Sequence, residues 1–324
     1  MRALRYALAL ILLAAATLWA FGPYEPDDLS AQFDPAAFNN DIPAYFADEE
    51  SRFPDIRSGT EKRVIWAGAP GEKTAIALVY LHGFSATSEE IHPVPDLIAR
   101  QLGANLIFTR LTGHGRTGEA MAGASIKDWM HDTAEALAAA RALGEQVVIL
   151  ATSTGGTLAV AAAMDPALSE RVAALVLVSP NFGINNPLAP LLTWPAARYW
   201  LPLVAGQERS FPPDSEAEAQ FWTTRYPSTA LMPMAALLAR VRKLDVSRIP
   251  IPVLFWFSDN DRVVRPDRTR DVAARWGGPA TIRIVAMGPA DDPNSHVVAG
   301  DIKSPGQTGL AAEEMTRWLK DHLD

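Results

Sequence analysis

The sequence predicts an α/β fold, with a mostly parallel, twisted sheet that carries helices on both faces. From residue 62 onward, short aliphatic or β-branched runs alternate with longer helical patterns, which is the order of βαβ units with right-handed crossovers. Most of the short runs are apolar almost throughout, as in strands that are buried on both faces. The chain has 324 residues, of which 48% are hydrophobic and 20% charged, so it can fill a large core.

Composition excludes several classes of function. The 29 Lys and Arg residues are outnumbered by 37 Asp and Glu residues, which leaves a net charge of -8. A chain with this charge is poorly suited to bind nucleic acid, whose phosphates attract cations. There is no cysteine, which excludes disulfides, thiolate zinc sites, iron–sulfur clusters and a cysteine nucleophile.

The first 21 residues have the pattern of a targeting segment. Arg2 and Arg5 precede an uncharged run rich in Leu and Ala, Tyr6–Phe21, and a basic-then-apolar order at the start is typical of export signals. The run is slightly shorter than the about 17–25 residues of a spanning helix. We therefore expect either a cleaved signal peptide or an N-terminal membrane anchor, with the protein exported to the periplasm or another extracytoplasmic space. The alternative is a buried N-terminal helix.

Residues 22–61 predict an acidic, proline-rich spacer. Between Gly22 and Arg57 there are five prolines and nine acidic residues against two basic ones. Aromatic residues are scattered through the segment, and a fully solvated linker would carry few of them. We expect an extended segment that lies partly against the main body and has a structural role.

The core is expected in residues 62–180 and 248–324. The candidate strands are, in chain order, Arg63–Trp66, Ala75–Leu81, Asn105–Thr109, Gln146–Ala151, Ala174–Val178, Val253–Phe257 and Thr281–Val285. The candidate helices between them are Ile91–Leu102, Ile126–Leu143, Gly156–Met164, Arg268–Trp276 and Leu310–His322. Parallel strands place ligand sites beyond their carboxyl ends, so chemistry is expected at that edge.

Residues 181–247 interrupt the alternation and are expected to form an insertion. This segment contains eight prolines and eight aromatic residues, and Arg198 is the one charge in residues 188–204. Such a stretch either packs on the sheet domain or walls an apolar pocket. The candidate substrate-binding residues are Trp194, Tyr199, Trp200 and Trp222. Two amphipathic helices are expected, at Ser215–Tyr226 and Thr229–Lys243. The alternative is an additional packing subdomain without a substrate role.

Ser153 is the candidate nucleophile. It lies in Ala151-Thr152-Ser153-Thr154-Gly155-Gly156, between a predicted strand and a predicted helix. A sharp strand-to-helix turn strains its central residue and needs small residues two positions to either side, and Ala151 and Gly155 meet that need. The same sequence is compatible with a structural connection or a phosphate-binding loop, although no P-loop lysine follows it.

A second loop lies at the same sheet edge. Leu81-His82-Gly83-Phe84 follows the strand Ala75–Leu81, and a glycine there lets backbone N–H groups turn toward a substrate oxygen. We predict that the amides of Phe84 and Thr154 form an oxyanion hole. His82 is then expected to shape the loop and not to act as the base.

A serine nucleophile needs a neutral imidazole as base and a carboxylate that orients it. Of the six histidines, His296 stands in a polar loop after the last strand and before the final helix, and it is the candidate base. The strand Val253–Phe257 runs into Ser258-Asp259-Asn260-Asp261. Asp261 is the candidate acid, with Asp259 capping or supporting the turn, although aspartate in loops often serves only the turn.

From these residues the chain resembles the serine-dependent α/β-hydrolase superfamily over about residues 63–322. The order Ser153, Asp261, His296 is that of the superfamily. Leu81-His82-Gly83-Phe84 resembles its oxyanion loop, and Thr112-Gly113-His114-Gly115 its Gly-His-Gly turn. The pattern is similar to the monoglyceride-lipase-like and carboxylesterase branch. Ala151 replaces the first glycine of the familiar Gly-x-Ser-x-Gly elbow.

The resemblance implies an α/β-hydrolase fold with a helical lid at residues 181–247, and hydrolysis of an acyl ester through a covalent intermediate on Ser153. No metal or organic cofactor is expected. Short or medium acyl esters and monoacylglycerols are the favoured substrates because the insertion is apolar. Two alternatives stay open. One is an aminopeptidase-like enzyme that holds a peptide terminus with Glu208, Glu216 or Glu218, and the other is an exported binding protein without turnover.

Overall fold

A seven-stranded sheet with the order β1-β3-β2-β4-β5-β8-β9 forms the centre of the computed structural model, which describes residues 2–323. Every neighbouring pair is parallel except β1 with β3. The strands are β1 Arg63–Ile65, β2 Thr74–Leu81, β3 Asn105–Phe108, β4 Gly144–Thr152, β5 Val172–Val178, β8 Val253–Phe257 and β9 Ala280–Ile284. The mostly parallel α/β sheet is confirmed, and each expected strand boundary lies within two residues of the observed one.

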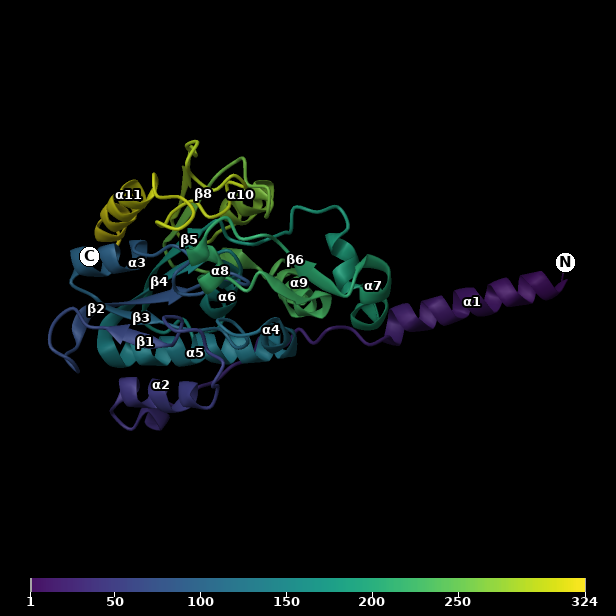
Figure 1. The fold of residues 1–324 in the computed structure, drawn as a ribbon, viewed down its shortest axis with the longest axis horizontal. Helices are drawn as coiled ribbons and strands as arrows, with labels where there is room; N and C mark the ends of the chain where they lie inside the picture. The colour runs from purple at the N-terminus through teal and green to yellow at the C-terminus, as the bar shows by residue number, and fades with distance from the viewer. Residues whose placement is uncertain (1, 324) are drawn as a thin grey trace.

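Helices cover both faces of the sheet (Figure 1). One face packs against α5 Ile126–Leu143, α6 Thr154–Ala163, α9 Leu231–Val241 and α10 Pro266–Ala274, and the other against α3 Val94–Leu102 and α11 Thr308–Lys320. Alternate side chains of β2 enter the two cores, with Val79 in the first and Leu78 in the second. Because neither face meets water, the strands carry apolar residues at almost every position.

Local capping explains why some helices match their expected bounds. Helix α5 begins and ends as predicted, since Ser125 and Asp128 form a capping box at its start. Helix α3 begins at Val94, three residues later than predicted, because the residues before Pro93 are turns. The short helix α4, Gly118–Gly123, was not predicted.

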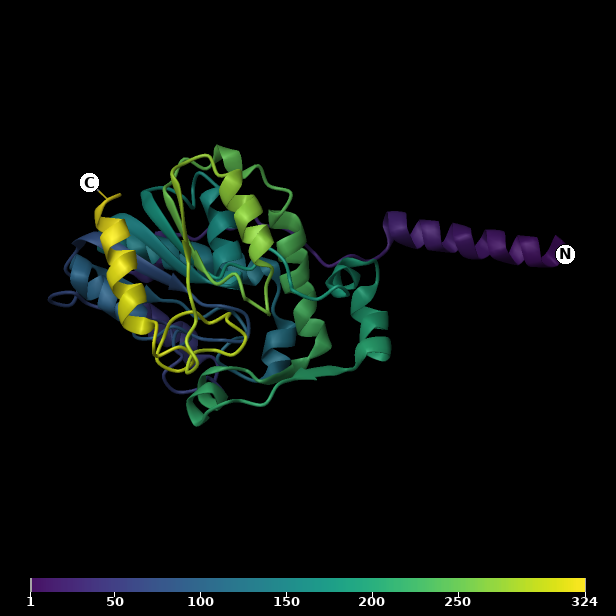
Figure 2. The same cartoon turned by 90° about the horizontal axis from the view of Figure 1, so that it is seen from above.

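The N-terminal helix α1, Arg2–Phe21, projects away from the rest of the chain (Figures 1 and 2). It has 20 residues and none of them is buried. By length and composition it can cross a membrane, and it is longer than the predicted apolar run because Arg2 to Arg5 join the helix. At its base, the Trp19 ring packs edge-on against the Trp194 ring, with 5.7 Å between the ring centroids.

The expectation of an extended spacer at residues 22–61 is wrong in part. Residues Pro35–Phe38 form the short helix η1, and Ile42–Ser51 form α2, whose first turn is capped by the Asp41 carboxylate. Phe38 and Phe46 are buried in the core beside α5. The aromatic residues therefore hold the segment against the main body, as the sequence predicted. Their packing stabilises a helix where composition indicated an extended linker.

The segment between β5 and β8 contains both helices and strands. Its elements are η2 Ala189–Thr193, α7 Ala197–Ala205, β6 Glu208–Ser210, α8 Glu216–Phe221, β7 Arg225–Pro227, η3 Ser228–Ala230, α9 and η4 Val246–Arg248. The predicted helix Ser215–Tyr226 is wrong beyond Phe221. Trp222 is extended, the Thr223 N–H donates to the carbonyl of Ser85, and β7 pairs with β6.

Candidate active site

Ser153 stands at the carboxyl end of β4, in a strained turn that leads directly into α6. Its φ of 50° and ψ of -116° are unfavourable for a residue with a side chain. The turn closes tightly, since a Cβ on Gly155 would lie 2.2 Å from the carbonyl oxygen of Leu81, and one on Gly156 would lie 2.9 Å from Pro180 Cβ. Gly155 is therefore required by close backbone approach, while the small Ala151 fits where the familiar elbow has glycine.

Ser153, His296 and Asp261 lie in one hydrogen-bonded chain. The Ser153 Oγ is 3.1 Å from His296 Nε2, and His296 Nδ1 is 2.8 Å from Asp261 Oδ2. All three residues are buried. The other carboxylate oxygen of Asp261 accepts the N–H groups of Val263 and Val264 at 2.8 and 2.9 Å. Asp259 instead pairs with exposed Arg270, so Asp261 is the acid that faces the imidazole.

Charges around His296 favour its protonated form. Burial lowers the pKa of the imidazole, but the Asp261 carboxylate beside Nδ1, with smaller contributions from Glu90 and Asp292, holds the pKa above its ordinary value. The loop that carries the ring is fixed by Asp292, whose carboxylate accepts the N–H groups of His296 and Val297, both at 2.9 Å. Sequence reasoning missed Asp292, because a polar loop with several acids shows no signal for the one that binds its backbone.

The two predicted oxyanion donors come from different loops: Thr154 follows Ser153 in the chain, and Phe84 belongs to the loop after β2. Among residues 2–323, neither the N–H of Phe84 nor that of Thr154 has a hydrogen-bond acceptor. A Cβ on Gly83, the residue before Phe84, would lie 3.1 Å from Ser153 Cβ. The loop Leu81–Phe84 therefore passes directly beside the serine. The role of these amides as an oxyanion hole stays a prediction.

Glu90 is a buried carboxyl that sequence reasoning missed. Its Oε2 accepts the N–H of Gly83 at 2.6 Å and the hydroxyl of Tyr80 at 3.2 Å. The Tyr80 hydroxyl in turn contacts Thr152 Oγ1 at 3.0 Å, next to Ser153. Burial raises the pKa of Glu90 to about 7. In the sequence it stands in a polar, charged stretch that resembles a solvated helix start, so nothing marked it as buried.

His82 and His114 lie near the site as structural groups. The Leu111 N–H donates to His82 Nε2, and His82 Nδ1 contacts the Gly83 carbonyl at 2.9 Å. Burial lowers the pKa of His82 to about 4 and that of His114 well below its ordinary value. Both imidazoles are therefore neutral near pH 7, and the hydrogen bonds of His82 agree with its expected role in shaping the loop.

The four aromatic candidates for substrate binding fall in two places, with Trp222 apart from the other three. The Trp194 ring packs against Trp19 and Trp200, near the base of α1, and Tyr199 is 67% exposed. Trp222 is buried, and its carbonyl accepts the Arg57 guanidinium at 2.7 Å. Within residues 2–323, none of these rings packs against the His296 ring. Their role in substrate binding stays a prediction.

Two of the carboxylates proposed to hold a peptide terminus are already paired. The Glu218 carboxylate is buried, contacts Lys303 at 2.8 Å and accepts the Asp214 N–H at 2.6 Å. Glu208 pairs with Arg225 at 2.5 Å. Lys303 neutralises the buried Glu218, whereas the Glu208–Arg225 pair is solvent-exposed and Glu216 is exposed in the first turn of α8.

Comparison with known proteins agrees with this architecture. Residues 72–286 match the sequence profile of the family described as serine aminopeptidase, S33. A thermostable monoacylglycerol lipase from Bacillus sp. (strain H-257) is 26% identical over 196 residues, which are 60% of this chain and 74% of that protein.

Solved structures share the fold. A structure described with the metagenome-derived lipolytic enzymes LipS and LipT has a TM-score of 0.66 at 21% identity, covering 82% of this chain and 100% of that one. A soluble variant of the Saccharomyces cerevisiae monoglyceride lipase has a TM-score of 0.59 at 11% identity, covering 81% and 91%. The chain is thus an α/β-hydrolase that resembles monoglyceride lipases, and it belongs to the hydrolase family described as serine aminopeptidase, S33.

Proposed function

We propose that this protein hydrolyses carboxylic esters through an acyl-enzyme on Ser153. The observation that carries the proposal is the continuous chain from the Ser153 hydroxyl through His296 to the Asp261 carboxylate. A hydroxyl, an imidazole and a carboxylate joined in this order are the components of an activated serine nucleophile. The strained turn at Ser153 supports the same role, because strain of this kind is typical of nucleophile elbows.

In the proposed reaction, His296 Nε2 takes the proton of the Ser153 hydroxyl as its oxygen attacks the ester carbonyl. Asp261 holds the Nδ1–H and stabilises the imidazolium. The free N–H groups of Phe84 and Thr154 would hold the oxyanion. The imidazolium then gives its proton to the leaving alcohol. A water attacks the acyl-enzyme, His296 takes one of its protons and returns it to Ser153, and the carboxylic acid departs.

An ester is favoured over a peptide as substrate. The similar Bacillus protein is named a monoacylglycerol lipase, and the buried Glu218, one of the acids proposed to hold a peptide terminus, is occupied by Lys303. We propose short or medium acyl esters or monoacylglycerols as the substrate class. Residues 181–247 would act as the lid, and their apolar side chains would gain by covering an acyl chain.

The N-terminal helix supports a proposal about location. Because α1 is long, apolar and unburied, it would serve as a signal peptide or as a membrane anchor, with the body of the enzyme outside the cytoplasm. An anchored enzyme would meet lipid esters at the membrane surface.

The test compares p-nitrophenyl esters of two to twelve acyl carbons with aminoacyl p-nitroanilides, using wild type, Ser153→Ala and the control Ser51→Ala on the exposed side of α2. We expect ester turnover by wild type and Ser51→Ala, and loss of nearly all of it in Ser153→Ala. Faster turnover of the anilides would support the aminopeptidase alternative. Full ester turnover by folded Ser153→Ala would refute the proposed nucleophile.

A further inference from the structure

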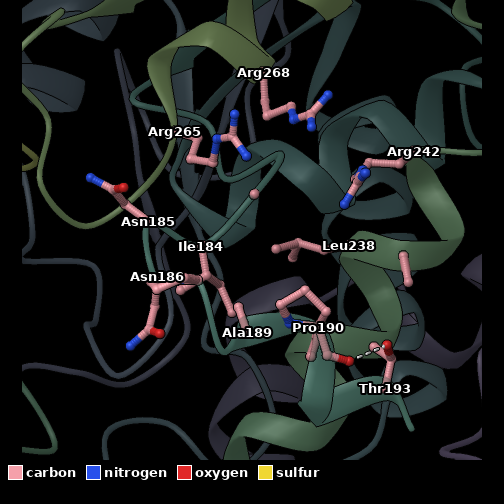
Figure 3. Close-up of a pocket in the computed structure, with 14 residues that line it drawn as sticks. Ile184, Asn185, Asn186, Ala189, Pro190, Thr193, Leu238, Arg242, Arg265 and Arg268 are labelled. Atoms are coloured by element: carbon pink, nitrogen blue, oxygen red, sulfur yellow. Dashed lines mark hydrogen bonds between the residues drawn. The ribbon is translucent and has the colours of Figure 1, made fainter.

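A pocket lies between η2, the end of α9 and the start of α10 (Figure 3), beside the loop that carries Asp261. Its volume is about 410 Å³, within the range of small-molecule sites. Arg242, Arg265 and Arg268 line it, and no carboxylate does. Their guanidinium groups extend toward the same space (Figure 3). Ser153, Asp261 and His296 are not part of its wall.

Ion pairing accounts for two of the three arginines only through solvent-exposed contacts, and it does not account for Arg242. The Arg242 guanidinium has no hydrogen-bond or ion-pair partner among residues 2–323. Arg265 donates to both carboxylate oxygens of Asp267, at 3.0 and 2.5 Å, and Arg268 donates to Asp271 at 3.2 Å. Both pairs are solvent-exposed, and exposed pairs contribute little to stability. Arg242 is therefore free to bind a ligand, and Arg265 and Arg268 can turn toward one by giving up solvent-exposed contacts.

Helix stability does not explain the arginines of α10 either. Arg265 is the N-cap of α10 and Arg268 lies in its first turn. The N-terminus of a helix carries a partial positive charge, so cations are unfavourable there and anions are favoured. On a chain with a net charge of -8, this local excess of positive charge is suited to an anionic ligand.

The opposite wall of the pocket is largely apolar. Ile184, Pro190 and Leu238 line it below the arginines in the view of Figure 3, where the side chains of Asn185 and Asn186 point away from the guanidinium groups. A site with guanidinium groups at one end and aliphatic side chains at the other is complementary to a molecule with an anionic head and a short apolar chain.

Backbone hydrogen bonds hold the segments that line this pocket together and join them to the loop that carries Asp261. Arg265 N–H donates to the Gly183 carbonyl at 2.8 Å, and Asn185 N–H donates to Val263 at 2.9 Å. A Cβ on Gly183 would lie 3.2 Å from Arg268 Cγ, so the arginine stem packs directly on this segment. The Val263 N–H in turn donates to Asp261. The wall of the pocket and the candidate acid therefore share one loop.

We propose that this arginine pocket binds an anionic amphiphile, whose carboxylate or phosphate group is held by Arg242, Arg265 and Arg268 and whose apolar chain lies against Leu238. Arginine is suited to this because its planar fork donates two parallel hydrogen bonds to either anion. The proposal does not depend on the ester hydrolase function, since the pocket contains none of the residues assigned to that reaction.

The test is isothermal titration of the full chain with octanoate, octyl phosphate, inorganic phosphate and 1-O-octylglycerol, none of which contains a carboxylic ester. The variants are Arg242→Gln and Arg268→Gln. The matched control is Arg270→Gln, which lies on α10 but pairs with Asp259 away from the pocket. Melting temperatures show whether each variant is folded.

We expect octanoate, octyl phosphate or both to bind with one site per chain, and the comparison between them identifies the preferred head group. Each pocket variant should weaken that binding by about tenfold, as for the loss of one charge-assisted contact, and the control should leave it unchanged. Failure of both anionic amphiphiles to bind would overturn the proposal. Equal binding of the neutral glycerol ether, equal binding of inorganic phosphate, or unweakened binding by both pocket variants would overturn it as well.

Discussion

Replacing Asp261 by Asn provides a sharp test of how the candidate triad is oriented. The Asp261 Oδ1 accepts two backbone N–H groups, from Val263 and Val264, and an asparagine there would keep its carbonyl oxygen on those donors. Its NH₂ group would then face His296 Nδ1, where Asp261 Oδ2 now lies at 2.8 Å. Because an N–H donor must face an unprotonated nitrogen, the imidazole proton would move to Nε2.

The imidazole would then present a donor to Ser153 and could no longer take its proton. A triad in the wrong tautomer loses about 10⁴-fold in kcat, which corresponds to about 5 kcal/mol of transition-state stabilisation. The fold should survive, because both backbone hydrogen bonds are kept.

The assay is kcat for p-nitrophenyl butyrate, with the melting temperature measured on the same samples. Asp259→Asn is the matched control, since it removes a carboxylate of the same loop that is paired with exposed Arg270, and it should change kcat by less than about fivefold. A folded Asp261→Asn protein with kcat within tenfold of wild type would refute the orientation argued for His296.

Three further predictions concern stability, each measured by urea denaturation. Burial raises the pKa of Glu90 from 4.5 to about 7, so the folded protein binds the Glu90 proton more tightly than the unfolded chain, and protonation of Glu90 contributes to the free energy of unfolding. That contribution is full below pH 4.5 and is lost as pH rises through 7, so over this range the free energy of unfolding of wild type should fall by roughly 3 kcal/mol relative to Glu90→Gln. Equal pH dependence would contradict this. Gly155→Ala should prevent stable folding of the elbow or lower the free energy of unfolding by more than about 3 kcal/mol. The control Gly309→Ala, which has open space around its Cβ, should be neutral or slightly stabilising. Similar effects of the two variants would argue against the close approach of Gly155 to the Leu81 carbonyl. Glu50→Ala should cost about 3–5 kcal/mol by leaving the buried Arg110 unpaired, and a loss under 1 kcal/mol would mean that this ion pair does not dock α2.

The core of the fold was predictable because its signals are local. Near-continuous apolar runs located the seven strands, and the longer helical pattern between two of them located α5, whose start is fixed by the Ser125 capping box. Helix α2 was not predictable from composition, since its prolines and acids resemble a linker. It forms because Phe46 enters the core and Glu50 pairs with the buried Arg110, and both partners are distant in the sequence.

The positions of the candidate site residues could be predicted where those residues directly follow the carboxyl end of a strand. Ser153 follows β4 and Asp261 follows β8, and because only β5 separates these parallel strands, their carboxyl ends lie close together at one edge of the sheet. Glu90 and Asp292 were missed because each acts on a nearby backbone N–H through a loop conformation that no residue pattern reveals. The helix predicted at Ser215–Tyr226 ended early because Thr223 bonds to Ser85, a contact between segments far apart in the chain.

The most direct test of the central claim is covalent labelling with a fluorophosphonate, followed by peptide mass spectrometry, on wild type and on folded Ser153→Ala. If the Ser153–His296–Asp261 chain activates the hydroxyl, wild type gains one adduct, on the peptide that contains Ser153, and the variant gains none. Wild type that stays unlabelled, or that carries the adduct on another residue, would contradict this account.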